Sequence, residues 1–179
     1  QELTTTDSKG DTRVAGVVAA STDNSIGMAS IGRNIDFIPI KITTNGIITH
    51  GYSGIIRAAQ DGAEIINLSW GGYSFLTTHQ DVINTIYNNF DCIIVAGAGN
   101  DNASQKIYPA AYDNVIAVAA TNQDDTRPDE NDWGANHGSN FGNWVDICAP
   151  GTSIYTTRNG NNYGNSSGTS LSSPMVSGL

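Results

Sequence analysis

Short apolar runs without polar alternation recur along this chain and constrain its fold more than any other feature. They occupy residues 35 to 42, 64 to 70, 92 to 98, 114 to 120 and 144 to 148. A strand that is apolar on both faces is typical of a parallel sheet, where both faces are covered. Parallel strands need long crossover connections, which helices usually supply. The sequence therefore predicts an α/β protein with a mostly parallel sheet.

Helical periodicity occurs between some of these runs. Residues 51 to 63 place Ile55, Ile56, Ala59 and Ala63 at helical spacing, and residues 77 to 90 give a second helix-sized interval. Right-handed crossovers then produce a three-layer α/β/α sandwich, with ligands expected at the carboxyl ends of the strands. The chain has 179 residues and shows no linker or internal repeat, so we expect one domain over residues 1 to 179.

The charge balance excludes some classes of partner. Eight basic and seventeen acidic residues give a net charge of -9, so no broad positive surface is expected that could neutralise phosphates. No apolar run approaches the roughly 20 residues that span a bilayer. We therefore expect neither a nucleic-acid partner nor a membrane partner.

The two cysteines, Cys92 and Cys148, are too few for a disulfide scaffold or a four-cysteine zinc site. Each lies in an apolar run, so we expect small buried side chains. A single disulfide between them is the alternative.

One segment places a hydroxyl where negative charge would be stabilised. Ser170 follows Gly168 and Thr169 and stands at the mouth of an apolar helix of small residues. The helix dipole and the free backbone N–H groups of such a position favour a developing anion. The simpler interpretation is that Ser170 is the N-cap of this helix.

A second segment ends a strand in glycines and an amide. Gly97, Ala98 and Gly99 lead to Asn100, whose side chain suits a donor to an oxyanion just beyond the strand. The same glycines could be mistaken for a dinucleotide fingerprint. However, Asn102 stands where the third glycine would be and no helical pattern follows, so no nucleotide site is expected.

Six motifs in this chain resemble the subtilisin-like serine proteases, the subtilases, and among them most the thermitase type. They are TRVAGVVAA at 12 to 20, INLSWGG at 66 to 72, VAGAGN at 95 to 100, YPAAYDNVIAVAAT at 108 to 121, SNFGNWVDICAPG at 139 to 151 and GTSLSSPMVSG at 168 to 178. They follow the family order and cover the chain from about residue 8 to its end. The resemblance implies a subtilisin-like fold, a serine endopeptidase activity and a peptide or protein substrate held in extended conformation.

The resemblance also implies roles for particular residues. Ser170 takes the position of the nucleophile and Asn100 that of the oxyanion donor. The peptide would lie between one backbone edge near Thr49 to Tyr52 and a second edge formed by Ser69, Trp70, Gly71 and Gly72. The specificity pocket would be lined by Gly97, Ala98, Gly99 and the segment leading to Tyr108, with Ile107 filling part of it and favouring smaller or apolar side chains.

The chain departs from the family pattern at the catalytic base. The family has His-Gly-Thr before Val-Ala-Gly, but here Gly10 stands at the His position, or a His is missing between Gly10 and Asp11. Without an imidazole, Ser170 has no general base. Asp11 is too weak a base at neutral pH and is interpreted as an N-cap. The remaining histidines, His50, His79 and His137, are interpreted as surface residues.

We therefore expect an internal piece of a longer subtilase domain, cut at both ends, which lacks the strand with the catalytic Asp and is inactive as written. A pseudoprotease that binds peptides in the same groove is the first alternative. A small-ligand or structural α/β domain is the second. The resemblance further suggests an extracellular or cell-envelope location, and no organic cofactor is expected.

Two loops complete the sequence predictions. Residues 22 to 28 resemble the calcium loop of the family, in which the Asn24 side chain and the carbonyls of Thr22, Ile26 and Met28 would face one calcium ion. The other ligands would come from upstream, and a plain turn is the alternative. The acidic insertion at 124 to 134 puts five carboxylates near Arg127 and is interpreted as a solvated loop.

Overall fold

The structure, a computed structural model, describes residues 11 to 33 and 35 to 179, so the prediction made for Gly10 lies outside it. Its helices are α1 (Asp11–Ala19), α2 (Gly51–Gln60), α3 (Thr77–Phe90), α4 (Glu130–Trp133) and α5 (Thr169–Ser177). Its strands are β1 (Thr43–Thr44), β2 (Ile47–Ile48), β3 (Ile65–Leu68), β4 (Ile93–Gly97), β5 (Ile116–Thr121), β6 (Ile147–Pro150), β7 (Ile154–Arg158) and β8 (Asn162–Ser166).

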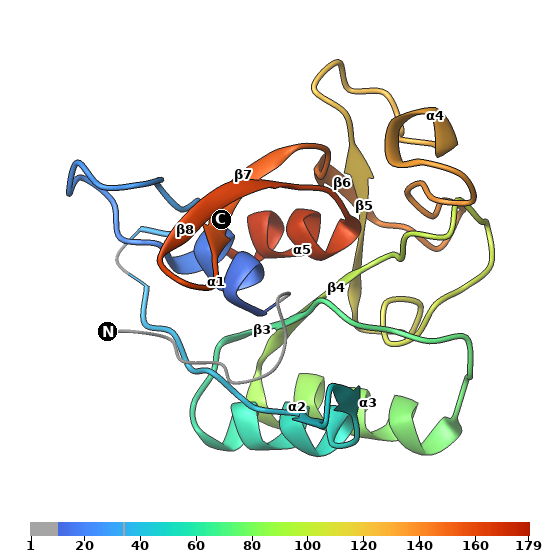
Figure 1. Ribbon diagram of the computed structural model, residues 1–179. Helices are drawn as coiled ribbons and strands as arrows, with labels where there is room; N and C mark the ends of the chain where they lie inside the picture. The colour runs from blue at the N-terminus through green and yellow to red at the C-terminus, as the bar shows by residue number, and fades with distance from the viewer. Residues whose placement is uncertain (1–10, 34) are drawn as a thin grey trace.

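A parallel sheet forms the centre of the molecule. Its strand order is β3-β4-β5-β6, and β1-β2 and β7-β8 form separate antiparallel hairpins. Helices α2 and α3 cover one face of the sheet, and α5 covers the other, with α1 and the β7–β8 hairpin packed beyond α5 (Figure 1). The predicted α/β sandwich with a mostly parallel sheet is confirmed.

The sheet contains four of the five predicted strands, and the fifth prediction is wrong. The run at 35 to 42 forms no strand, and the short β1–β2 hairpin begins just after it. A strand is held by backbone hydrogen bonds to a neighbour, and no described strand pairs with this run. Two of its isoleucines pack by side chain, Ile40 against the core and Ile42 beside Gly54 of α2, whereas Ile35, Phe37 and Ile38 are exposed.

Alternation along β4 distributes its side chains between the two faces. Ile94 and Ala96 belong to the larger core cluster, which also contains Ile83 and Ile86 of α3. Val95 belongs to a smaller cluster with Val118 and Ala149, against which Met175 and Val176 of α5 pack. Because successive side chains of a strand point to opposite faces, a continuous apolar run supplies both cores at once.

The cysteine predictions are only partly right. Both thiols are free, so the alternative disulfide is wrong. Cys92 is buried, and burial, followed by the nearby Asp91 carboxylate, raises the pKa of its thiol. Cys148 is exposed, contrary to the prediction. It lies on β6, an edge strand of the sheet, where Ala149 is the residue that faces the core.

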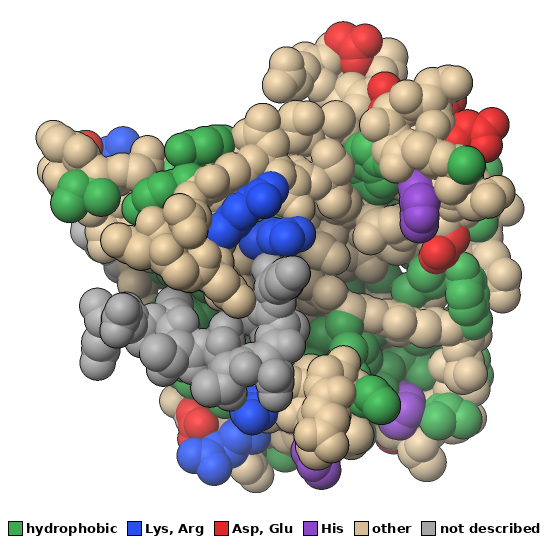
Figure 2. All heavy atoms as spheres, viewed as in Figure 1, with side chains coloured by type: hydrophobic (Ala, Val, Ile, Leu, Met, Phe, Trp, Pro, Cys, Tyr) green, Lys and Arg blue, Asp and Glu red, His purple; other side chains and the backbone are tan. Residues whose placement is uncertain are grey.

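The acidic insertion is solvated as predicted but is more ordered than a plain loop. Acidic side chains gather on the surface around α4 and the loop before it (Figure 2). Asp129 caps α4 through a capping box. Arg127 donates to the Asn102 side chain and to the Ser139 carbonyl rather than to a carboxylate. Among the described helices, none is long and apolar enough to cross a membrane.

Candidate active site

The turn that leads into α5 presents Ser170. Gly168 is the N-cap of α5 with a φ of 145°, a conformation that favours glycine, and Thr169 is the first helical residue. The interpretation of Ser170 as N-cap is therefore wrong, because Ser170 already lies in the first turn. Its half-buried Oγ donates to the Ser69 carbonyl at 3.5 Å, its one hydrogen-bond partner within the described residues. This long bond leaves the hydroxyl accessible.

Asn100 is fixed beside the same turn by Thr169. The Asn100 Oδ1 accepts from the Thr169 backbone N–H at 2.9 Å and from the Thr169 Oγ1 at 3.0 Å. The Thr169 Oγ1 in turn accepts from the Gly99 N–H at 3.0 Å. Because a backbone N–H can only donate, the oxygen of the Asn100 amide must face Thr169. The Nδ2 group has no hydrogen-bond acceptor among the described residues, and it lies 3.5 Å from the position that a Cβ on Gly168 would take.

Asn140 supports this loop and was missed by the sequence predictions. It is fully buried, its Oδ1 accepts from the N–H groups of Asp101 and Ala103, and its Nδ2 donates to the Ala98 carbonyl at 3.0 Å. One amide thus satisfies three backbone groups around Asn100. The only sequence signal for this role was that Asn140 lies in the family motif at 139 to 151, and that motif was interpreted as a strand without a role for the amide.

Hydroxyl and amide groups tie α5 to β3, which the sequence predictions also missed. The Ser69 Oγ donates to the Ser170 carbonyl at 3.0 Å and lies 3.1 Å from the Ser173 Oγ. The Asn67 Nδ2 donates to the Ser69 Oγ, and the Ser177 Oγ donates to the Asn67 Oδ1 at 3.2 Å. Buried polar groups that are all hydrogen-bonded define one geometry. The network therefore sets the position of Ser170 relative to the end of β3.

The segment after β3 offers one free backbone edge. Gly72 and Tyr108 exchange two backbone hydrogen bonds of 2.8 Å. In an extended segment, the backbone groups of neighbouring residues point to opposite sides. The N–H and C=O groups of Gly71 therefore point away from Tyr108, on the same side as the Ser69 carbonyl that faces Ser170. This is the geometry to which an extended peptide can add as a strand.

The predicted second edge near Thr49 to Tyr52 is wrong in its last two residues. Gly51 and Tyr52 lie in the first turn of α2, where the N–H groups cannot form a strand ladder. Gly51 has a different role, because a Cβ there would come within 2.7 Å of the Trp70 ring. Trp70 thus packs over the start of α2, and its ring meets that of Tyr52 edge to face at 5.5 Å between centroids.

Ile107 lies between the two glycine segments. A Cβ on Gly71 would be 2.5 Å from Ile107 Cγ2, and a Cβ on Gly99 would be 2.4 Å from Ile107 Cδ1. Gly97 instead approaches Thr169, where a Cβ would be 3.0 Å from the carbonyl oxygen. Ala98 is fully buried and its side chain does not reach the surface. The structure thus brings Ile107, Gly71 and Gly99 together.

None of the three histidines, all of which lie in the described residues, is bonded to Ser170. His50 is the N-cap of α2, and His137 lies in a turn after α4. The His79 ring stacks on Tyr52 with a centroid distance of 3.6 Å. None of these histidines can therefore serve as the imidazole base of Ser170.

The environment of Tyr52 affects its own ionisation. Burial, followed by the interaction with Tyr112, raises the pKa of Tyr52 above its ordinary value.

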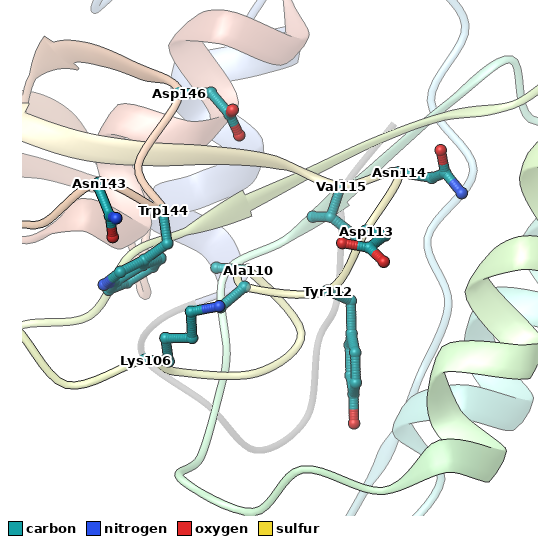
Figure 3. A pocket seen from close by; sticks show the side chains of 10 residues that line it. Lys106, Ala110, Tyr112, Asp113, Asn114, Val115, Asn143, Trp144 and Asp146 are labelled. Carbon is teal, nitrogen blue, oxygen red and sulfur yellow. The ribbon is translucent and has the colours of Figure 1, made fainter.

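A hollow of about 380 Å³ lies elsewhere and is lined in part by the loop that follows Tyr108 (Figure 3). Its lining residues are Lys106, Ala110, Ala111, Tyr112, Asp113, Asn114, Val115, Asn143, Trp144 and Asp146. They include no serine, threonine, cysteine or histidine. The Tyr112 hydroxyl is already bonded to the backbone of Leu76. The hollow therefore offers no alternative serine, threonine or cysteine nucleophile.

The predicted calcium loop does not make a complete cation site with the residues described. The Asn24 Oδ1 accepts from the Ile26 N–H at 2.9 Å, so the single predicted side-chain ligand closes a turn within its own loop. No group of three or more His, Cys, Asp or Glu side chains that could hold a metal occurs within residues 11 to 33 and 35 to 179. Calcium prefers six to eight oxygen ligands, which this loop alone does not supply.

Comparisons with known proteins agree with this geometry. The family model of the subtilase family, peptidase S8, matches residues 6–179. A thermophilic serine proteinase of Bacillus sp. (strain AK1) is 40% identical over 94% of this chain, and thermitase of Thermoactinomyces vulgaris is 36% identical over 94%. The chain spans 40% and 58% of the lengths of these two relatives.

Solved structures show the same similarity. The epidermin leader peptide processing serine protease of Staphylococcus aureus superposes with a TM-score of 0.78 at 25% identity, over 94% of this chain and 51% of that protein. A protease of Pseudoalteromonas arctica gives a TM-score of 0.75 at 30% identity, over 93% and 55%. With the order of motifs, the parallel sheet and the Ser170–Asn100 arrangement all in agreement, the chain belongs to the subtilase family.

Proposed function

We propose that this chain carries the nucleophile half of a subtilase endopeptidase site. Ser170 would attack the carbonyl carbon of a peptide bond, and the Asn100 Nδ2 would donate to the oxyanion that forms. The observation that carries the proposal is the Thr169 bridge, which fixes the Asn100 oxygen and leaves the Nδ2 group without a hydrogen-bond partner among the described residues. A donor oriented before the reaction stabilises the transition state without reorganisation.

The substrate would be a peptide or protein segment in extended conformation. Its backbone would pair with the free edge at Ser69 and Gly71. Gly72 holds this edge through its two backbone hydrogen bonds to Tyr108, and Trp70 holds it by packing on the start of α2, whereas Gly97 and Ala98 lie in and after β4. The side chain before the scissile bond would meet Ile107 between Gly71 and Gly99, which favours small or apolar side chains. We infer an extracellular or cell-envelope location for the parent protein from its subtilase relatives.

The chain as given should not hydrolyse peptides at a useful rate, because Ser170 has no imidazole to take its proton. In a subtilisin, removing the triad serine or histidine alone lowers kcat by about 10⁶. Peptide binding without cleavage is the second candidate, and the unpaired backbone of Gly71 favours it. Steady cleavage of a mixed peptide library that Ser170→Ala abolishes would overturn the prediction of inactivity.

A fluorophosphonate probe tests the nucleophile assignment. The unmodified chain should not be labelled. A repaired protein with Gly10→His and Asp11→Gly, fused to an upstream subtilase strand that carries Asp, should be labelled at Ser170. Adding Asn100→Ala should slow labelling by about 10² to 10³, the usual effect of removing one oxyanion donor. A repaired protein that folds but leaves Ser170 unlabelled would refute the assignment and favour the peptide-binding alternative.

A further inference from the structure

Two arginines hold neighbouring residues of β8. The Arg13 Nη1 of α1 donates to the Ser166 Oγ at 3.0 Å, and the Arg158 Nη2 of β7 donates to the Asn165 carbonyl. Basic side chains gather over α1 and the β7–β8 hairpin on the face seen in Figure 2. This is unusual in a chain with a net charge of -9, and it localises positive charge at one place on an acidic protein.

Neither arginine has a carboxylate partner in the described part of the chain. The one ion pair formed there joins Arg57 and Asp61 within α2. Within the described residues, Arg13 and Arg158 bond only to neutral oxygens, and the buried Arg13 Nε has no hydrogen-bond partner there. Leaving a buried N–H unpaired is unfavourable, and two neighbouring cations also repel each other. An anionic ligand at the exposed part of the two guanidinium groups would offset this repulsion, whereas the buried Arg13 Nε lies out of its reach.

The surroundings leave room for the Arg158 guanidinium. A Cβ on Gly164 would lie 2.7 Å from the Arg158 Nε, so only glycine lets this side chain lie across β8. The hairpin register places Thr156 opposite Gly164, and the Thr156 Oγ1 donates to the Arg13 carbonyl at 2.7 Å. Both arginines are therefore anchored to the same hairpin, one through α1 and the other through β7.

The pair lies close to the nucleophile along the chain. Ser166 precedes Ser170 by four residues, a span of at most about 14 Å even when fully extended. An extended peptide advances about 3.3 Å per residue. The span from Ser170 to Ser166 is therefore comparable to the distance from the bond held at Ser170 to a side chain about four residues along an extended peptide.

We propose that Arg13 and Arg158 form a carboxylate clamp that gives this groove a preference for acidic peptides. The inference rests on the proposed function, because it needs a peptide held near Ser170. The ligand class is a Glu or Asp side chain of an extended segment, since the planar guanidinium matches a carboxylate in two-point hydrogen bonds. The clamp would add selectivity for acidic side chains to a backbone edge whose main-chain hydrogen bonds do not distinguish one peptide sequence from another.

Fluorescence anisotropy with two labelled, capped peptides tests the clamp. One peptide alternates Ala and Glu, and the other has Gln in place of every Glu. At low salt the Glu peptide should bind about tenfold more tightly, the scale of one charge-assisted hydrogen-bonded pair. The preference should decrease as sodium chloride is raised, because exposed charges are screened.

Three variants locate the effect. Arg13→Gln and Arg158→Gln should each remove most of the Glu preference, whereas Arg57→Gln, which makes the same charge change on α2, should retain it. Arg158 is exposed, so Arg158→Gln should fold even if Arg13→Gln does not. Equal binding of the two peptides, or a preference that survives Arg158→Gln in a folded protein, would overturn the clamp. Binding of the Gln peptide reports on the groove alone, so groove and clamp can fail separately.

Discussion

The two faces of the parallel sheet are held in different ways. On the α2/α3 face, large aliphatic side chains such as Ile55, Ile83 and Ile86 are almost completely buried. On the α5 face, apolar packing is limited, and the helix is fixed by hydroxyl and amide groups and by a close approach to Gly97. The first face supplies stability through buried area, and the second sets positions through hydrogen bonds and backbone contact.

This difference fits the chemistry proposed for the α5 face, which presents Ser170. A hydrophobic core tolerates volume-conserving exchanges among apolar side chains at moderate cost, because burial has no direction. A hydrogen-bond network does not tolerate them, because each bond requires a narrow range of distances and angles. The face that presents Ser170 is therefore the face where small residues and directional contacts predominate. Four substitutions or conditions test this division, beginning with the largest expected effect.

Truncating the α2/α3 core should have the largest effect on stability. Ile83→Ala removes a side chain with no exposed surface, and such changes typically cost about 2 to 5 kcal/mol because a cavity remains. Ile93→Ala, at a residue that is 48% exposed, is the matched control and should cost much less. Urea denaturation followed by circular dichroism measures both. Equal losses would show that this face is not the main source of stability.

Gly97→Ala should come next, with a loss of about 1 to 2 kcal/mol from forced repacking. The added Cβ would be 3.0 Å from the Thr169 carbonyl oxygen and 3.1 Å from its Oγ1, so Thr169 must shift and with it the bridge to Asn100. Gly72→Ala is the control, since its Cβ would meet nothing within 4 Å. Thermal unfolding gives the cost. A Gly97→Ala protein as stable as the control would show that the approach to Thr169 is loose.

Ser177→Ala should cost about 1 kcal/mol, the net value of a typical hydrogen bond. It removes the donor to the Asn67 Oδ1 and to the Ser173 carbonyl, while almost no apolar packing changes. Ser74→Ala, at an exposed serine, should be neutral. The same denaturation measurement distinguishes them, and a neutral Ser177→Ala would mean that the network adds no stability to the α5 face.

The smallest effect concerns alkaline pH on the α2/α3 side. The pKa of Tyr52 is raised by burial, so the folded state favours the neutral phenol. The resulting stability is complete below the unfolded pKa, near 10, and is lost as the pH rises toward the folded value. Tyr52→Phe should therefore make stability less dependent on pH above about 10, measured by melting temperature across that range. An unchanged slope would contradict the assignment to Tyr52.

The amino-acid sequence by itself determined the layers of this fold and the candidates for its chemistry. Apolar runs buried on both faces require a covered parallel sheet, so four of five strands were predictable from period and composition. Ser170 and Asn100 were predictable because each lies beside a glycine turn, which is a local property: Ser170 stands two residues after Gly168 at the start of a helix, and Asn100 directly follows Gly99 beyond a strand. The absence of a histidine before Val14 is likewise visible in the sequence alone.

Tertiary structure decided everything that depends on partners distant in sequence. The run at 35 to 42 has the composition of a strand, but pairing requires a neighbour, which local sequence does not specify. The N-cap of α5 is Gly168 and not Ser170, and the amide that holds the loop around Asn100 belongs to Asn140. The pairing of Arg13 with Ser166 joins residues 153 positions apart. Such contacts arise only when the packed sheet brings separate segments together, because side-chain hydrogen bonds act over a few ångströms and carry no signal in sequence spacing.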